Sequence, residues 1–91
     1  MEKIVSEVRE IISSICEIDQ EDIGLDVNLI EELEIDSIDF MDVTYEIDQK
    51  YGIKLPVEGW MEKVNNQEAK ISDYFIMSKL CKSIEVLISE K

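Results

Sequence analysis

Histidine is absent from the 91 residues of this chain, and proline and tryptophan each occur once. A serine or cysteine nucleophile usually needs a histidine base, and hydrolases place that serine in a G-x-S-x-G turn, which the sequence also lacks. The two cysteines, Cys16 and Cys81, cannot form the usual tetrahedral zinc site without histidine. The sequence therefore excludes self-contained acyl-transfer catalysis and such a zinc site, and we expect both thiols to pack in the core.

Basic residues are also scarce: nine lysines and arginines stand against 22 acidic residues, which gives a net charge of -13. This charge repels phosphate backbones and anionic lipid headgroups, so nucleic-acid binding is excluded and partners should present basic patches. Solubility alone could also account for the acidity. The position of the acids along the chain has to decide between the two explanations.

Long apolar runs are missing as well. No run approaches the ~18 residues of a membrane-spanning helix, so we expect no stable membrane insertion. The first turns, MEKIVSEVREII, carry charges and do not resemble a signal peptide. Together with the two distant cysteines, this pattern predicts a reduced, cytoplasmic protein.

Apolar residues at helical spacing dominate what is present. They predict one helix over residues 2–17, a second over 36–51 that Gly52 ends, and, between the two, a long loop anchored by apolar side chains. A chain of this length forms one domain with a small core. We therefore expect a single domain, residues 1–91, in the form of an all-α bundle of three main helices plus a short one.

The short helix and the closing helix lie in the last third of the chain. Pro56 suits the start of the short helix, in which Trp60, Met61 and Val64 are expected to face the core. Ser72 is the candidate N-cap of the closing helix.

The helix predicted over residues 36–51 has three faces. At about 100° per residue, one side collects the residues to be buried: Phe40, Val43, Thr44, Ile47 and Tyr51. A second apolar stripe lies roughly 130° away, and an acidic group lies beyond it: Ile38, Met41 and Tyr45, then Asp39, Asp42 and Glu46. An apolar stripe edged by charge is typical of a transient docking surface.

One stretch of the long loop can be tested as a calcium site. In DQEDIGLDVNLI, residues 19–30, a glycine follows the first aspartate at the spacing of a calcium-binding loop. Ile23 holds the fifth position, and Ile30 holds the twelfth, where a bidentate glutamate is required. We therefore predict no metal site in this loop.

Ser37 stands among carboxylates at the start of the second predicted helix, in EIDSIDFMDVTYEID. Its simplest role is that of an N-cap, which either Ser37 or Asp36 could fill. Because the serine follows a loop, its hydroxyl is also accessible to another enzyme that modifies it. The neighbouring apolar stripe and acids favour this second role.

The segment ELEIDSID, followed by a helix and by YGIKLP, resembles the acyl carrier proteins, whose motif is D-S-L at the start of the second helix. The resemblance spans the chain, with Ile38 in place of the usual leucine. It implies that Ser37, preceded by Asp36, receives a 4'-phosphopantetheine arm from coenzyme A through a phosphopantetheinyl transferase. The thiol of that arm would carry an acyl chain as a thioester, so the protein would be a carrier and not an enzyme.

The resemblance also implies a use for the second helix. Its apolar stripe would meet pockets on fatty-acid synthesis enzymes and acyltransferases. Basic patches on those enzymes would pair with the acids of the helix: Asp36, Asp39, Asp42, Glu46 and Asp48. Fast association and ready release suit a monomeric shuttle that visits many enzymes.

Beyond Pro56 the sequence is similar to the specialised carriers that hold very long acyl chains for lipid A. Their W-x-x-x-V-N and Y-F-x-x-x-x-L-C patterns fall on these positions: Trp60, Val64, Asn65, Tyr74, Phe75, Leu80 and Cys81. The aromatic residues either fill a larger core or shape a pocket or partner surface. Two alternatives stay open: a carrier of an aminoacyl or polyketide unit, and an acidic helical interaction module whose Ser37 is never modified.

Overall fold

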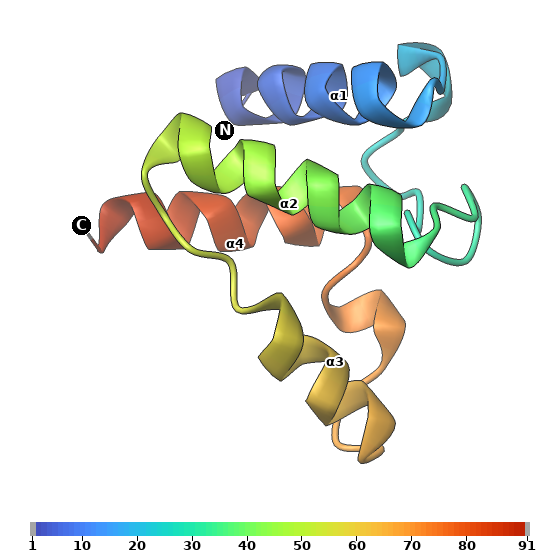
Figure 1. Ribbon diagram of the computed structural model, residues 1–91, viewed down its shortest axis with the longest axis vertical. Helices are drawn as coiled ribbons and strands as arrows, with labels where there is room; N and C mark the ends of the chain where they lie inside the picture. Colours follow the sequence, from blue (N-terminus) through green and yellow to red (C-terminus); the bar gives the residue numbers. More distant parts are fainter. Residues whose placement is uncertain (1, 91) are drawn as a thin grey trace.

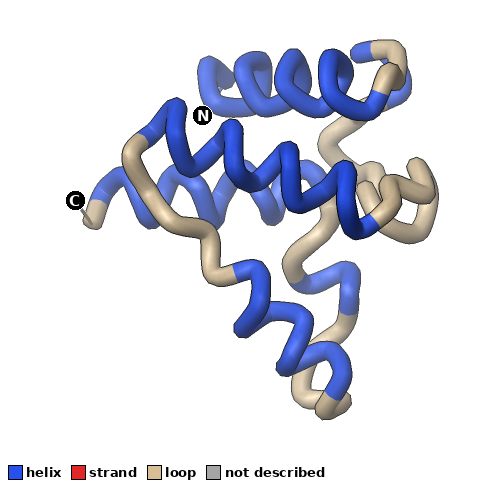
Figure 2. The backbone as a smooth tube through the Cα atoms, viewed as in Figure 1, coloured by secondary structure: helices blue, strands red, loops and turns tan. Residues whose placement is uncertain are grey.

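A computed structural model describes residues 2–90 of the chain. Within this range all regular secondary structure is helical (Figure 1, Figure 2). The helices are α1 (Glu2–Cys16), α2 (Ser37–Tyr51), α3 (Val57–Asn65) and α4 (Met77–Ser89). Two 3-10 turns, η1 (Gln20–Asp22) and η2 (Ile71–Asp73), lie in the connections. The prediction of an all-α fold with three main helices and a short one is confirmed.

The helices α1, α2 and α4 form a bundle, whereas α3 and η2 form a smaller lobe to one side of it (Figure 1). Within the bundle, α1 packs against both α2 and α4. Apolar side chains from the bundle, the long loop and the lobe meet in one core: Val8, Ile12, Ile23, Leu29, Ile35, Phe40, Val43, Ile47, Leu55, Val57, Trp60, Phe75, Met77, Leu80, Cys81 and Ile84. The face of α2 that was predicted to be buried is buried, with Tyr51 half-buried at its end.

One buried side chain, that of Asn28, organises the long loop between α1 and α2. Its Oδ1 atom accepts hydrogen bonds from the backbone N–H groups of Ile30 (3.1 Å) and Glu31 (2.9 Å). Its Nδ2 group donates to Oε1 of Glu31 (2.9 Å), and its backbone N–H donates to Oε2 of Glu32 (2.7 Å). Local side-chain bonds therefore close a turn at the point where the loop enters the core.

The prediction that Ser72 caps the closing helix is wrong, because Ser72 lies in η2 and α4 begins at Met77. The long loop supplies the acceptors that the start of α4 needs. The N–H groups of Met77 and Ser78 donate to the carbonyls of Val27 (3.0 Å) and Leu25 (2.9 Å). Backbone acceptors from a distant segment thus satisfy a helix end that a side chain usually caps.

The helix α3 follows Pro56, as predicted, and aromatic side chains attach it to the bundle. Trp60 is buried, and its ring stacks on that of Tyr74 with 5.1 Å between centroids. Phe75 meets Trp60 edge-on at 5.9 Å. The expectation that Met61 faces the core is wrong, since Met61 is exposed. It follows Trp60 by one residue, which turns it about 100° away from the buried side of α3.

Candidate functional site

Ser37 is the first residue of α2, and its side chain is exposed. Asp36 precedes it in an extended conformation and caps the helix, because its Oδ1 atom accepts a hydrogen bond from the N–H of Ile38 (2.7 Å). The structure thus decides which of two adjacent residues is the cap. Asp36 takes this role, which leaves the hydroxyl of Ser37 available for another use.

The start of α2 is a favourable place for a phosphate ester. The first N–H groups of a helix lack acceptors within the helix, and the helix dipole places positive charge at this end. Both effects would stabilise a phosphate on Ser37 and offset the repulsion from Asp36 and Asp39. The exposed hydroxyl and its surroundings therefore fit a group attached through a phosphodiester.

An apolar cavity of 160 Å³ opens beside Ser37, between α2, the long loop and the α3 lobe. Its walls are formed by Ile30, Ile35, Ser37, Phe40, Met41, Val57, Met61, Ile71 and Phe75. Apolar walls of this kind favour an alkyl chain over water. Because Ser37 itself forms part of the cavity wall, a chain attached near Ser37 can enter the cavity.

The second apolar stripe of α2 is exposed, as predicted. The exposed fraction is 73% for Ile38, 52% for Met41 and 61% for Tyr45. Asp42 and Glu46 are exposed and Asp39 is half-buried beside them. Adjacent apolar side chains on one helix, bordered by acids, are characteristic of a contact surface. We call these six residues the docking face.

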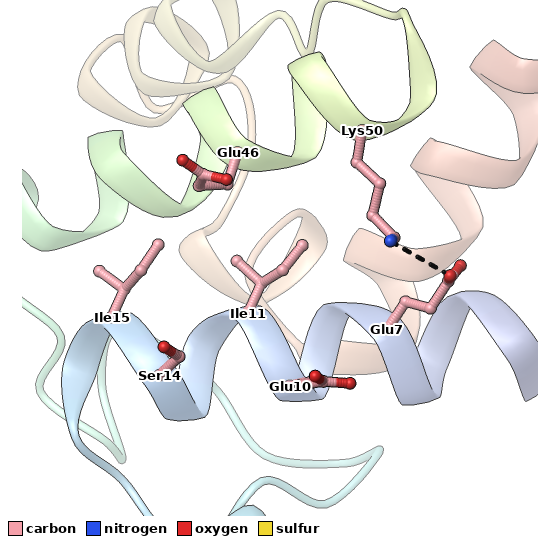
Figure 3. A pocket seen from close by; sticks show the side chains of 7 residues that line it. All are labelled: Glu7, Glu10, Ile11, Ser14, Ile15, Glu46 and Lys50. Atoms are coloured by element: carbon pink, nitrogen blue, oxygen red, sulfur yellow. Dashed lines mark ion pairs between the residues drawn. The ribbon is translucent and has the colours of Figure 1, made fainter.

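The docking face borders a groove of 410 Å³ between α1 and α2, into which Glu46 and Lys50 project (Figure 3). The Nζ atom of Lys50 forms an ion pair with Oε2 of Glu7 on α1 (3.3 Å). The hydroxyl of Tyr51 donates a hydrogen bond to Oε1 of Glu7 (2.8 Å), and this bond together with Lys50 holds the pKa of Glu7 below its ordinary value. The only basic residue of α2 is thus directed toward α1, so the docking face keeps its negative charge.

Asp48 differs from the other acids predicted to bind partners. Its Oδ1 atom accepts a hydrogen bond from the N–H of Leu55 (3.0 Å), and its carbonyl accepts one from the N–H of Ile53 (3.2 Å). At about 100° per residue it lies on the opposite side of the apolar stripe from Asp42. Asp48 therefore fixes the segment that leads into α3, and its part in partner binding stays a prediction.

Both cysteines have raised pKa values. Burial raises the pKa of Cys81 to about 11. Cys16 is half-buried and packs against the core; burial and, to a smaller extent, the charges of Asp39, Asp36 and Asp42 raise its pKa. Because the thiolate is the reactive form, both thiols are unreactive near neutral pH. Core packing is confirmed for Cys81, whereas Cys16 lies at the margin of the core.

Two features of the site were not predicted from the sequence. Met61 lines the cavity, as Met41 does, although its spacing of four residues from Val57, another wall residue, could have indicated this. Glu34, just before the cap of α2, has a φ of 53°. This left-handed conformation costs a glutamate about 1–2 kcal/mol, and glycine is its usual sequence signal. Because residue 34 is not a glycine, the sequence did not indicate this sharp turn before α2.

The chain matches the family model of the phosphopantetheine attachment site over residues 6–66. With Ser37 exposed at the start of α2 within that range, the chain belongs to the family of phosphopantetheine-bearing acyl carrier proteins. It is 40% identical to the acyl carrier protein AcpXL of Mesorhizobium japonicum, over the whole of this chain and 98% of that protein. AcpXL of Brucella melitensis is 36% identical over the same shares. AcpXL of Rhizobium meliloti is 39% identical over 92% of this chain and 88% of that protein.

Membership of the family defines the chemistry. The protein is an acyl carrier with a 4'-phosphopantetheine prosthetic group, and acyl carrier proteins are carriers rather than catalysts. They interact with a phosphopantetheinyl transferase and with acyl-handling enzymes. Among residues 2–90, no helix combines the length and the apolar character needed to cross a membrane.

Proposed function

We propose that Ser37 bears the phosphopantetheine arm and that the domain of residues 1–91 carries very long acyl chains for lipid A synthesis. The assignment of Ser37 as the attachment residue is supported by one observation above all: its side chain is exposed at the capped start of α2, directly beside an apolar cavity. The cargo class is supported by the full-length similarity to AcpXL proteins. The sequence patterns around Trp60 and Tyr74, which resemble those of carriers for very long acyl chains, agree with it.

The arm supplies a flexible thiol on which an acyl chain is held as a thioester. The residues of the protein position and protect this group. Asp36 fixes the first turn of α2, and the positive end of the helix stabilises the phosphate on Ser37. Phe40, Phe75 and the other cavity walls keep water away from the first carbons of the chain.

Partner enzymes are recognised through the docking face. Its acids attract basic patches and speed association, while its small apolar centre provides contact area without slow release. A cytoplasmic monomer keeps this face accessible to the transferase, to fatty-acid synthesis enzymes and to the acyltransferase that takes the cargo.

Intact-protein mass spectrometry tests whether the arm is attached to Ser37. After incubation of the apo protein with coenzyme A and a phosphopantetheinyl transferase, we expect one added arm, and Ser37→Ala should gain none. Ser89→Ala, at the end of α4, serves as the control and should be loaded like the wild type. An arm on Ser37→Ala, or none on the folded wild type, would contradict the assignment. The second outcome would favour an unmodified interaction module.

Charge reversal tests the docking face. Asp39→Lys with Glu46→Lys should slow association with a partner acyltransferase by about tenfold or more, and should weaken its dependence on salt, because steering by opposite charge is lost. The matched control is Glu68→Lys with Glu90→Lys, which changes the net charge equally at exposed positions outside α2. Stopped-flow association rates that are equal for the two double variants would show that net charge, and not the docking face, guides the encounter.

A carrier of an aminoacyl or polyketide unit would share Ser37 and the fold. The walls of the cavity favour an alkyl cargo over such polar groups, because their mostly apolar side chains offer few hydrogen-bonding partners. The cargo released from the native protein distinguishes these possibilities.

A further inference from the structure

Two apolar hollows are linked through the contact between the side chains of Trp60 and Phe75. The first is the 160 Å³ cavity beside Ser37, whose walls include Val57 and Phe75. The second is a groove of 260 Å³ between the start of α3 and α4, lined by Pro56, Trp60, Lys82, Ser83, Val86 and Leu87. Trp60 connects the two, since it forms a wall of the groove and its ring contacts Phe75, which forms a wall of the cavity.

The cavity beside Ser37 is too small for a long cargo. A dry apolar cavity of about 150 Å³ holds one benzene molecule, or about six carbon atoms. A cavity of 160 Å³ therefore accommodates only the first part of a long acyl chain. The remaining methylene groups must find apolar surface elsewhere, because their exposure to water is unfavourable.

The groove on α4 offers such a surface. The exposed fraction of Val86 is 43%, although its neighbour Leu87 packs against the core. The charged end of Lys82 is directed to Glu85 (Nζ–Oε1, 3.3 Å). Long lysine side chains commonly keep the charge in water while their methylene groups cover apolar surface. The groove lies on α4, apart from the docking face on α2, so partner binding through α2 does not account for it.

Aromatic rings in contact with one another lie between the cavity and the groove, because Phe75 lines the first and Trp60 lines the second. Trp60 stacks nearly parallel on Tyr74, with an interplanar angle of 5°, and meets Phe75 edge-on at 85°. These rings, more than helix–helix packing, attach the α3 lobe to the bundle, in which the close helix pairs are those of α1 with α2 and with α4. Movement of Trp60 relative to Phe75 would therefore join the cavity to the groove.

We propose that an acyl chain longer than the cavity passes Trp60 and lays its distal part in the groove between Pro56 and Val86. The inference rests on the proposed attachment at Ser37 and assigns a second binding segment for the alkyl cargo. Trp60 determines how far the chain advances: it packs behind Phe75, a wall of the cavity, when the chain is short, and it lines the path of a long chain.

Trp60 is the only tryptophan of the chain, so its fluorescence reports contact with the cargo directly. The apo protein is loaded by a phosphopantetheinyl transferase with saturated acyl coenzyme A thioesters that carry one bromine atom at a chosen carbon. Bromine quenches tryptophan emission on contact. We expect little quenching when the bromine is close to the thioester and loss of most of the emission when it lies at carbons beyond the capacity of the cavity. Intact mass confirms loading in each sample.

Val86→Asp tests the groove, because a carboxylate there disfavours an alkyl chain. The quenching by mid-chain bromine should fall severalfold in this variant. Leu25→Asp is the matched control: it places the same charge at another half-exposed apolar residue, with an exposed fraction of 47%, in a separate groove. Its quenching profile should equal that of the wild type.

The results that would overturn the path past Trp60 differ from those that would overturn attachment of the arm at Ser37. Absence of loading in the mass spectrum overturns the assignment of Ser37. A fully loaded wild type whose emission is not quenched at any bromine position shows instead that the chain leaves between Met41 and Met61, and overturns the path past Trp60. Equal quenching in Val86→Asp and Leu25→Asp overturns the groove as its destination. The wild-type profile needs no variant, so the path can be tested even if a substitution impairs folding.

Discussion

At the scale of single residues, Glu7 links α1 to the end of α2 through two partners, Tyr51 and Lys50. The hydroxyl of Tyr51 and the ammonium group of Lys50 both favour its charged form, so its pKa lies below the ordinary value of 4.5. A carboxyl whose pKa is lowered by folding stabilises the fold above its unfolded pKa. This contribution is lost as the pH falls through the folded pKa.

Tyr51→Phe tests this link. Without the hydroxyl, the pKa of Glu7 should rise toward its ordinary value, since the hydrogen bond from Tyr51 is the largest cause of the shift. Acidification to below the pKa of Glu7 should then remove less of the free energy of unfolding than in the wild type. An NMR titration of the Glu7 carboxyl and urea unfolding at neutral and acid pH measure the two effects. An unchanged pKa of Glu7 in Tyr51→Phe would contradict this view of the contact.

At the scale of elements, the long loop and α4 depend on each other. Asn28 closes the turn that lets Leu29 donate from its N–H to the carbonyl of Phe75 (2.8 Å), and Asn28 itself forms an isolated antiparallel bridge with Ile76. The neighbouring carbonyl of Val27 caps the start of α4. The loop therefore acts as the missing N-cap of α4 and also forms part of the cavity wall, through Ile30 and Ile35.

Asn28→Ala should lower the free energy of unfolding by about 2–3 kcal/mol, because the N–H groups of Ile30 and Glu31 lose their buried acceptor. Amide hydrogen exchange at these two residues and at Met77 should quicken, since the turn and the start of α4 loosen together. Asn65→Ala, at the exposed end of α3, is the control and should change stability by less than about 0.5 kcal/mol. Exchange that quickens in the loop but not at Met77 would contradict the coupling.

At the scale of the whole molecule, the bundle was predictable because its helices are long and strongly periodic. The buried and exposed sides of α2 followed from spacing alone. The candidate at Ser37 followed from its place at the start of that helix and from the resemblance to the acyl carrier proteins. The features that the sequence did not predict depend on long-range backbone contacts. The start of α4 depends on carbonyls of Leu25 and Val27, which no local pattern reveals, so Ser72 looked like a suitable cap.

The packing of the α3 lobe was likewise only partly predictable from the sequence. Its aromatic residues were recognised, but the sequence left two uses open: filling a core or shaping a pocket. In the structure Phe75 does both, because it is buried and also lines the cavity beside Ser37. Met61 was expected in the core and instead borders that cavity, since the lobe stands to one side of the bundle and leaves one flank of α3 uncovered (Figure 1).

The mass of the native protein shows whether Ser37 carries a long acyl chain through a thioester-bearing arm. The protein is isolated from its own cells with the thioester intact, and the peptide containing Ser37 is weighed before and after treatment with hydroxylamine. We expect a phosphopantetheine arm on that peptide and release of a long alkyl acyl group. An unmodified Ser37, or an arm that releases only an aminoacyl or short polar group, would contradict this expectation.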